Sequence, residues 1–208
     1  MKKYKDYLIL TIFTMGSQAL LYFLIKVFIS DYNILKTIIN VPLVKPFIFI
    51  YNSWYPFIIL NTFIIYKNDK KMFKYLITTM LITAFFAHIT FIVYPSEIIR
   101  PEIVVNNFTD WFINFTYKAD TPAINCLPSM HCAYCFITSY YILKCKKINF
   151  KSKFLIVSYS FLIVLSTLFT KQHIIEDAAL ALVYTSIAVL IVSISKERII
   201  NFFKKIKL

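Results

Sequence analysis

The sequence predicts an all-α membrane protein with six transmembrane helices, on the basis of its composition and its apolar runs. Of its 208 residues, 59% are hydrophobic and only 16% are charged, whereas soluble domains are roughly 25% charged. A helix that crosses a bilayer needs roughly 20 mostly apolar residues, so six would use nearly all the apolar positions. The apolar runs are long and continuous, which favours helices over membrane β-strands.

Six apolar runs are predicted to form the spans of a single domain that covers residues 1–208. They lie at Tyr7–Ile29, Phe47–Tyr66, Phe73–Tyr94, Ser129–Leu143, Phe154–Thr170 and Asp177–Ser195. The first run follows a basic start, as a signal peptide does, but it is too long and lacks a clear cleavage site, so we expect it to be retained. In the longest linker, residues 95–128, the segment Val104–Tyr117 is predicted to form a short helix at the membrane surface.

The distribution of cations predicts that both termini are cytoplasmic. Of the 23 lysines and arginines, 17 fall in the N-terminus, the second loop, the fourth loop and the C-terminus. Cytoplasmic segments are enriched in these residues, so the long linker is expected to face the extracytoplasmic side of the cell membrane. The net charge of +13 then reflects basic loops next to anionic lipids, and nucleic acid is not an expected partner.

The composition also excludes several kinds of site. A single glycine in the chain excludes a glycine-rich phosphate loop and a G-x-S-x-G nucleophile elbow, since each needs at least two. The four cysteines match no zinc spacing with paired histidines, so neither a metal nor a cofactor is predicted. Cys132 and Cys135 form a C-x-x-C within an apolar run, and we interpret them as packing residues.

Polar residues with catalytic potential gather on the predicted outward side. Arg100 follows the third span, Ser129 and His131 open the fourth, and His173 and Asp177 lie at the start of the sixth. A guanidinium matches phosphate oxygens, and the free N–H groups of a helix start attract anions. A carboxylate four residues after a histidine can orient its imidazole as a nucleophile or base. Together these residues predict a phosphate site with two histidines in catalytic roles.

Each element also has an ordinary structural interpretation. An Arg-Pro pair at a span end can be an interface anchor, and a Pro-Ser pair before a helix can be a simple cap. A His–Asp pair four residues apart is often structural, and His88 inside the third span is interpreted as an interhelical hydrogen-bond partner. Three clusters on one side of a chain otherwise poor in polar groups favour function, because ionisable groups near a membrane are costly.

The three clusters resemble the motifs of the type-2 phosphatidic acid phosphatase superfamily, which are KxxxxxxRP, PSGH and SRxxxxxHxxxD. The matching residues are Arg100 and Pro101 for the first motif, Pro128, Ser129 and His131 for the second, and Ser166, His173 and Asp177 for the third. The segment from Asp120 to His131 is also similar to a branch that includes relatives of inositol phosphorylceramide synthase. The resemblance covers roughly Phe73 to Ser195.

The resemblance implies a six-helix membrane fold with its site at the outer interface and a phosphorylated lipid as substrate. It also implies a metal-independent double displacement through a phosphohistidine. In that scheme His173 is the nucleophile, Asp177 orients it, and His131 is the general acid for the leaving alcohol. Arg100 and Ser129 hold the phosphoryl oxygens.

Three positions depart from the motifs, and two of the three family cations are lost. Val93 stands in place of the lysine, Met130 in place of the glycine and Thr167 in place of the second arginine. The site is therefore expected to admit diphosphates or diesters as well as monoesters. Lys171, two residues before His173, either supplies the missing charge to the substrate or anchors the helix end at the interface.

Two enzymatic functions and one non-enzymatic function remain open from the sequence. The first is hydrolysis of a phosphorylated lipid, and the second is transfer of a phospho-headgroup to a lipid alcohol. The third is a six-span transporter or a non-catalytic binding relative. Retention of both histidines and the aspartate argues against a non-catalytic relative, and the chain lacks the paired broken spans typical of transporters. The identity of the lipid and the oligomeric state are open as well.

Overall fold

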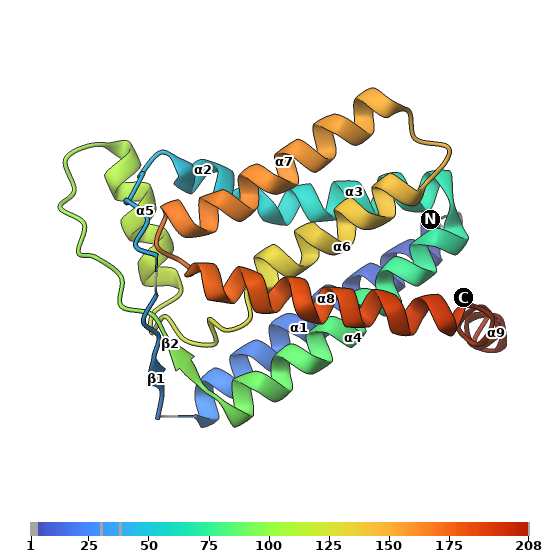
Figure 1. Ribbon diagram of the computed structural model, residues 1–208, viewed down its shortest axis with the longest axis horizontal. Helices are drawn as coiled ribbons and strands as arrows, with labels where there is room; N and C mark the ends of the chain where they lie inside the picture. Colours follow the sequence, from blue (N-terminus) through green and yellow to red (C-terminus); the bar gives the residue numbers. More distant parts are fainter. Residues whose placement is uncertain (1–3, 30, 38, 208) are drawn as a thin grey trace.

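The computed structural model describes residues 4–29, 31–37 and 39–207, and this part of the chain is all-α apart from two very short strands. The long helices lie roughly along one common axis, some in one sense and some in the other, and form a bundle (Figure 1). The elements are α1 (Lys5–Phe28), β1 (Asn33–Ile34), α2 (Phe47–Asn52), α3 (Trp54–Asn68), α4 (Lys70–Val93), β2 (Ser96–Glu97), α5 (Phe108–Ala119), α6 (Met130–Lys144), α7 (Phe150–Phe169), α8 (Ile175–Ile194) and α9 (Lys196–Lys205).

The two ends of the bundle differ in what they carry. Both marked termini lie at one end, together with the α3–α4 and α6–α7 turns and α9 (Figure 1). The opposite end carries α5 and the parallel pair of β1 and β2, which joins Asn33 to Ser96 and so links the segments after α1 and α4. The basic loops thus share one end, and the long linker covers the other.

Four helices in the described residues, α1, α4, α7 and α8, are long and apolar enough to cross a membrane. The other two predicted spans are shorter. The second is divided at Ser53 into α2 and α3, and Pro56 in the first turn of α3 provides no N–H to continue the helix from α2. Helices α3 and α6 have 15 residues each, which is roughly 22 Å of helix against about 30 Å of hydrocarbon.

Side-chain caps set where four of the helices begin. Asp69, Asn107, Ser129 and Asn149 precede α4, α5, α6 and α7, and each accepts a hydrogen bond of 2.9–3.3 Å from the backbone N–H three residues later. Because Asn107 is the cap, α5 begins at Phe108 and not at Val104, where the surface helix was predicted to begin.

Helix α4 lies at the centre of the bundle, where it packs against α1, α3, α6 and α8. Its buried face includes Phe73, Leu76, Met80 and Phe91, which are almost inaccessible. Helix α6 packs closely on α7, where Sγ of Cys132 lies 3.6 Å from Oγ1 of Thr167, and Ala133, Cys135 and Thr138 of α6 are fully buried as well. Small residues let helix backbones approach each other, and both cysteines are free and buried as predicted.

Many large apolar side chains on the outer faces of the long helices are exposed. Examples are Phe13 on α1, Ile92 on α4, Phe161 on α7 and Leu190 on α8, each more than half exposed. Soluble monomers rarely expose contiguous apolar surfaces of this kind. The exposed surface is consistent with helices that contact lipid.

Candidate active site

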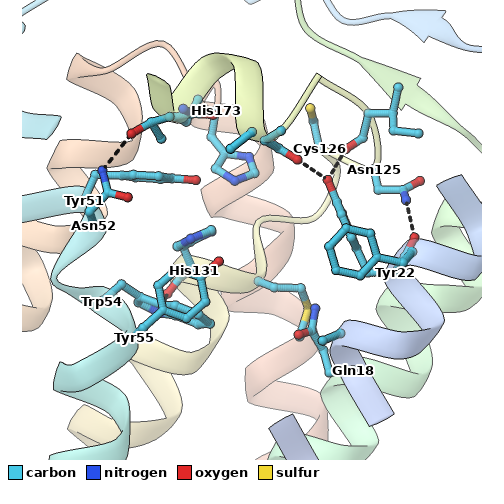
Figure 2. Close-up of a pocket in the computed structure, with 18 of the residues that line it drawn as sticks. Gln18, Tyr22, Tyr51, Asn52, Trp54, Tyr55, Asn125, Cys126, His131 and His173 are labelled. Carbon is cyan, nitrogen blue, oxygen red and sulfur yellow. Dashed lines mark hydrogen bonds between the residues drawn. The ribbon is translucent and has the colours of Figure 1, made fainter. Parts of the chain in front are cut away.

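A cavity of about 340 Å³ lies where the linker meets the helices. Side chains from α1, α2, α3, α4, α5, the linker, the start of α6 and the turn before α8 line it. Three of the six residues that the sequence predicts for the site, Arg100, His131 and His173, are among them. Figure 2 shows the two histidine rings pointing toward one another across the cavity, and their ring centroids are 5.9 Å apart.

His173 is held by a buried carboxylate, as its spacing predicts. Its Nδ1 lies 2.9 Å from Oδ2 of Asp177, a residue with no exposed surface in the first turn of α8. The backbone N–H of Ile174 donates to the same oxygen at 3.1 Å, so the carboxylate is fixed from two sides. Because Asp177 occupies Nδ1, Nε2 is the ring nitrogen of His173 that is left for chemistry in the cavity.

The short turn between α7 and α8 places His173 at the cavity. The carbonyl oxygen of Thr167 accepts hydrogen bonds from the backbone N–H groups of Gln172 at 3.0 Å and His173 at 3.1 Å. Lys171 adopts a left-handed backbone conformation with φ of 54°, which reverses the chain direction and is uncommon for a residue other than glycine. The reversal carries Gln172 and His173 to the cavity wall.

The side chain of Lys171 points elsewhere. Its ammonium group donates to Oδ1 of Asn40 at 2.7 Å and to the carbonyl of Val41, and Lys171 does not line the cavity. The lysine therefore ties the turn to the segment after β1. This placement favours the anchoring alternative over a direct contact with substrate phosphate.

His131 sits among aromatic rings at the start of α6. Its ring stacks on Tyr51 at a centroid distance of 4.7 Å and contacts Trp54 at 4.4 Å. Trp54 also donates from Nε1 to the backbone carbonyl of His131 at 3.2 Å. Among the described residues, no group pairs with the buried Nε2 of His131. A buried ring nitrogen without a hydrogen-bond partner is unfavourable in free energy. Here the nitrogen is available to pair with a bound ligand.

Arg100 has its terminal N–H groups committed within the protein. Its Nη1 donates to the backbone carbonyls of Tyr117 at 3.3 Å and Asp120 at 3.1 Å. Its Nη2 donates to Oδ2 of Asp120 at 2.7 Å and to Oε1 of Gln172. Only the buried Nε lacks a partner in the described part of the chain. Arg100, which was predicted to hold phosphate, therefore pairs through Nη2 with the carboxylate of Asp120 in this structure.

Ser129 lies outside the cavity lining and positions the helices that carry the site. It is fully buried, it does not line the cavity, and its hydroxyl caps α6 by accepting from Cys132. Its backbone N–H donates to the carbonyl of Asp177 at 3.1 Å. Ser129 thus joins the first turns of α6 and α8, which carry His131 and the partner of His173. His88 lies on α4, where its ring nitrogens pair with the carbonyls of Ala84 and Gln18, as an interhelical partner would.

Several cavity residues were missed from the sequence. Tyr22 donates to Oδ1 of Asp120 at 2.7 Å, and Asn125 lies beside it with φ of 57° and an unpaired Oδ1 in the described region. Gln172 had one usable signal, since it directly precedes His173. Asp120 also had one, because it is an acid in the outward linker. For Tyr22 on α1 the sequence offered no signal at all.

Two polar contacts outside the long helices join the linker to neighbouring segments. Lys45 donates to Oδ1 of Asp110 at 2.6 Å, and this hydrogen bond lowers the pKa of that carboxyl. The hydroxyl of Tyr117 donates to the carbonyl of Thr170 at 2.6 Å, and burial raises the pKa of Tyr117 to about 12. At the cavity wall, burial raises the pKa of the Cys126 thiol, so this residue is a neutral thiol and not a thiolate nucleophile.

The cavity combines a carboxylate-held imidazole, a second imidazole with an unpaired nitrogen, and a guanidinium at the same wall. Groups of these three kinds can serve as a nucleophile, a proton donor and a cation beside a developing oxyanion. No protein-family model matches the chain, and neither a curated protein nor a solved structure matches it. What the site does is therefore inferred from its own residues.

Proposed function

We propose that the chain is a membrane lipid phosphatase that hydrolyses a phosphorylated lipid through a phosphohistidine on His173. The observation that supports this most directly is the 2.9 Å contact between His173 and Asp177 beside a second histidine in one cavity. The motif resemblance to the type-2 phosphatidic acid phosphatase superfamily agrees with the same three residues. The proposed reaction is independent of metals.

The proposed reaction has two steps that share one proton. In the first, Nε2 of His173 forms a bond to phosphorus as the bond from phosphorus to the lipid oxygen breaks, and protonated His131 gives its proton to that oxygen. In the second, neutral His131 takes a proton from water as the water oxygen bonds to phosphorus and the bond to His173 breaks. Asp177 stabilises the positive charge on His173 while the phosphoryl group is attached.

The edge of the cavity supports a lipid as the substrate. Phe23 of α1, Tyr55 of α3 and Phe115 of α5 line the cavity and are still 59%, 59% and 55% exposed. An apolar edge open to the surroundings suits an acyl chain that continues from a phosphate bound at the histidines. A small hydrophilic phosphate ester has no apolar chain to contact such a surface.

The proposed topology has six spans, with α2 and α3 together forming the second and α6 the fourth. Both termini and the basic loops would then be cytoplasmic, and the cavity would face the extracytoplasmic surface of the cell membrane. The common location of the basic turns and the termini at one end of the bundle supports this orientation (Figure 1).

Transfer of a phospho-headgroup to a lipid alcohol is the second candidate. It uses the same phosphohistidine with an alcohol in place of water. The apolar edge of the cavity favours it, because a second lipid can approach there.

The test is to incubate purified protein with phosphate-labelled lipids in a chelator, with and without a lipid alcohol. A phosphoenzyme that is labile in acid and stable in base is expected in the parent and absent in His173→Ala. His88→Gln is the matched histidine control and should keep the phosphoenzyme, since His88 bonds only backbone carbonyls among the described residues. Equal labelling of His173→Ala and the parent would refute the mechanism. Label recovered in the alcohol would identify the transferase.

A further inference from the structure

Asp120 is the one acidic side chain among the described residues that lines the cavity. Three groups hold its carboxylate in place. The Tyr22 hydroxyl donates to it at 2.7 Å, Nη2 of Arg100 lies 2.7 Å away, and the Lys26 ammonium lies 3.6 Å away. The side chain is 35% exposed. The carboxylate is therefore part of the cavity wall and is accessible to a ligand bound in the cavity. A charge held from α1 and from the linker is a fixed part of the site.

The position of Asp120 changes what Arg100 offers to a phosphate. All four terminal N–H groups of Arg100 are used by Tyr117, Asp120 and Gln172, which leaves only Nε. One N–H gives a single hydrogen bond, whereas a fork gives two parallel ones. The guanidinium charge is also offset by the adjacent carboxylate. A phosphate bound here therefore meets less positive charge than the sequence motif predicts.

The number of charges on the phosphate decides how strongly Asp120 opposes it. A phosphate monoester carries close to two negative charges at neutral pH, and a phosphodiester carries one. Coulomb repulsion is proportional to the charge of the ligand. The carboxylate therefore penalises the monoester about twice as much as the diester at the same distance.

We propose that Asp120 is a specificity-determining residue that makes this site favour phosphodiester lipids over phosphate monoesters. The proposal rests on the function proposed above and specifies its substrate class. With a diester, Nε2 of His173 bonds to phosphorus as the bond from phosphorus to the diacylglycerol oxygen breaks, and protonated His131 gives its proton to that oxygen. In the second step the water oxygen bonds to phosphorus as the bond from phosphorus to His173 breaks, neutral His131 takes a proton from the water, and the headgroup phosphate is released.

The turnover experiment compares two lipids that have the same acyl chains. Phosphatidic acid is the monoester, and phosphatidylglycerol is the diester. The parent is expected to have the higher kcat/KM for the diester. Asp120→Asn keeps an oxygen for Arg100 and Tyr22 while it removes the charge, and it should raise the ratio of monoester to diester kcat/KM about tenfold. Glu102→Gln, which removes an exposed charge from the same linker, should leave the ratio within about twofold.

A second variant is expected to change the ratio of monoester to diester kcat/KM in the opposite direction. Lys26→Met removes a cation beside Asp120 and keeps a long side chain, so it should lower the ratio about threefold. The two substitutions are expected to change this ratio in opposite directions. A general loss of folded protein would not produce opposite changes. An unchanged ratio in Asp120→Asn, or a parent that prefers the monoester, overturns the proposal.

A binding experiment separates this proposal from the proposed reaction. The chain has two tryptophans, so in a Trp111→Phe background Trp54 at the cavity is the only tryptophan fluorophore. In Asp120→Asn, the Kd of the monoester should fall relative to the Kd of the diester. Absence of turnover in the parent refutes the proposed function, while the Kd ratio still decides the role of Asp120. An unchanged Kd ratio refutes the role of Asp120 whether or not turnover occurs.

Discussion

Replacement of Asp177 by asparagine tests the charge behind the proposed nucleophile. Oδ2 of Asp177 accepts from Nδ1 of His173 at 2.9 Å and from the N–H of Ile174 at 3.1 Å, in a site with no exposure. A hydrogen bond to a charged group contributes about 1.5–3 kcal/mol, against about 0.5–1.5 kcal/mol for a neutral one. The difference is greatest when His173 is positive in the phosphoenzyme. The two ranges differ by about 1–1.5 kcal/mol, and at about 1.4 kcal/mol for each tenfold change in rate we expect kcat to fall roughly 5- to 10-fold.

The assay measures both rate and binding, because the asparagine keeps the shape of the site. The Kd of the lipid, from Trp54 fluorescence in the Trp111→Phe background, should stay within about twofold of the parent. Glu176→Gln is the matched control, since it removes a charge from the same turn of α8 and does not line the cavity. The reasoning fails if Asp177→Asn keeps full turnover. It also fails if the loss of rate is matched by an equal loss of binding.

Four further results are expected. A tag between α6 and α7 should be accessible only from the cytoplasm, and a cysteine at the exposed position of Glu102 should react only from outside; the reverse pattern contradicts the topology. His131→Ala should slow turnover about 10²–10⁴-fold for lipids with poor leaving groups and much less for good ones, and equal slowing for both argues against a general acid. Lys171→Ala should keep turnover within about twofold, because its ammonium binds the segment after β1; a loss of about 10²–10³-fold would instead show direct oxyanion stabilisation. The pKa of Asp110 is lowered by Lys45, so the pair stabilises the fold above the unfolded pKa of about 3.9 and loses that effect as pH falls through the lower folded value. The Tm difference between the parent and Lys45→Met should therefore be present at pH 6 and shrink below about pH 4, whereas a constant difference contradicts the pairing.

Features that depend on neighbours along the chain could be predicted from the sequence. The long apolar runs form helices, because a bilayer-length apolar segment satisfies its backbone groups within itself. The four-residue spacing predicts the contact between His173 and Asp177, although His173 lies in the turn before α8 and only Asp177 is within the helix. The start of α6 at a buried serine cap follows from the same kind of local rule. The break of the second run at Ser53 was missed, although Pro56 gave a local signal for it.

Features that depend on which surfaces meet were decided only by the tertiary structure. Arg100 pairs with Asp120 and Gln172, which are 20 and 72 residues away, and Tyr22 reaches Asp120 across 98 residues. The motif spacing predicted that Arg100 would hold phosphate, but the spacing carries no information about a carboxylate that folds back from the linker. Helical geometry determines neighbours within about four residues. The partners of a side chain on another helix depend on how whole surfaces pack, so the charge that a substrate meets in this cavity is a property of the fold.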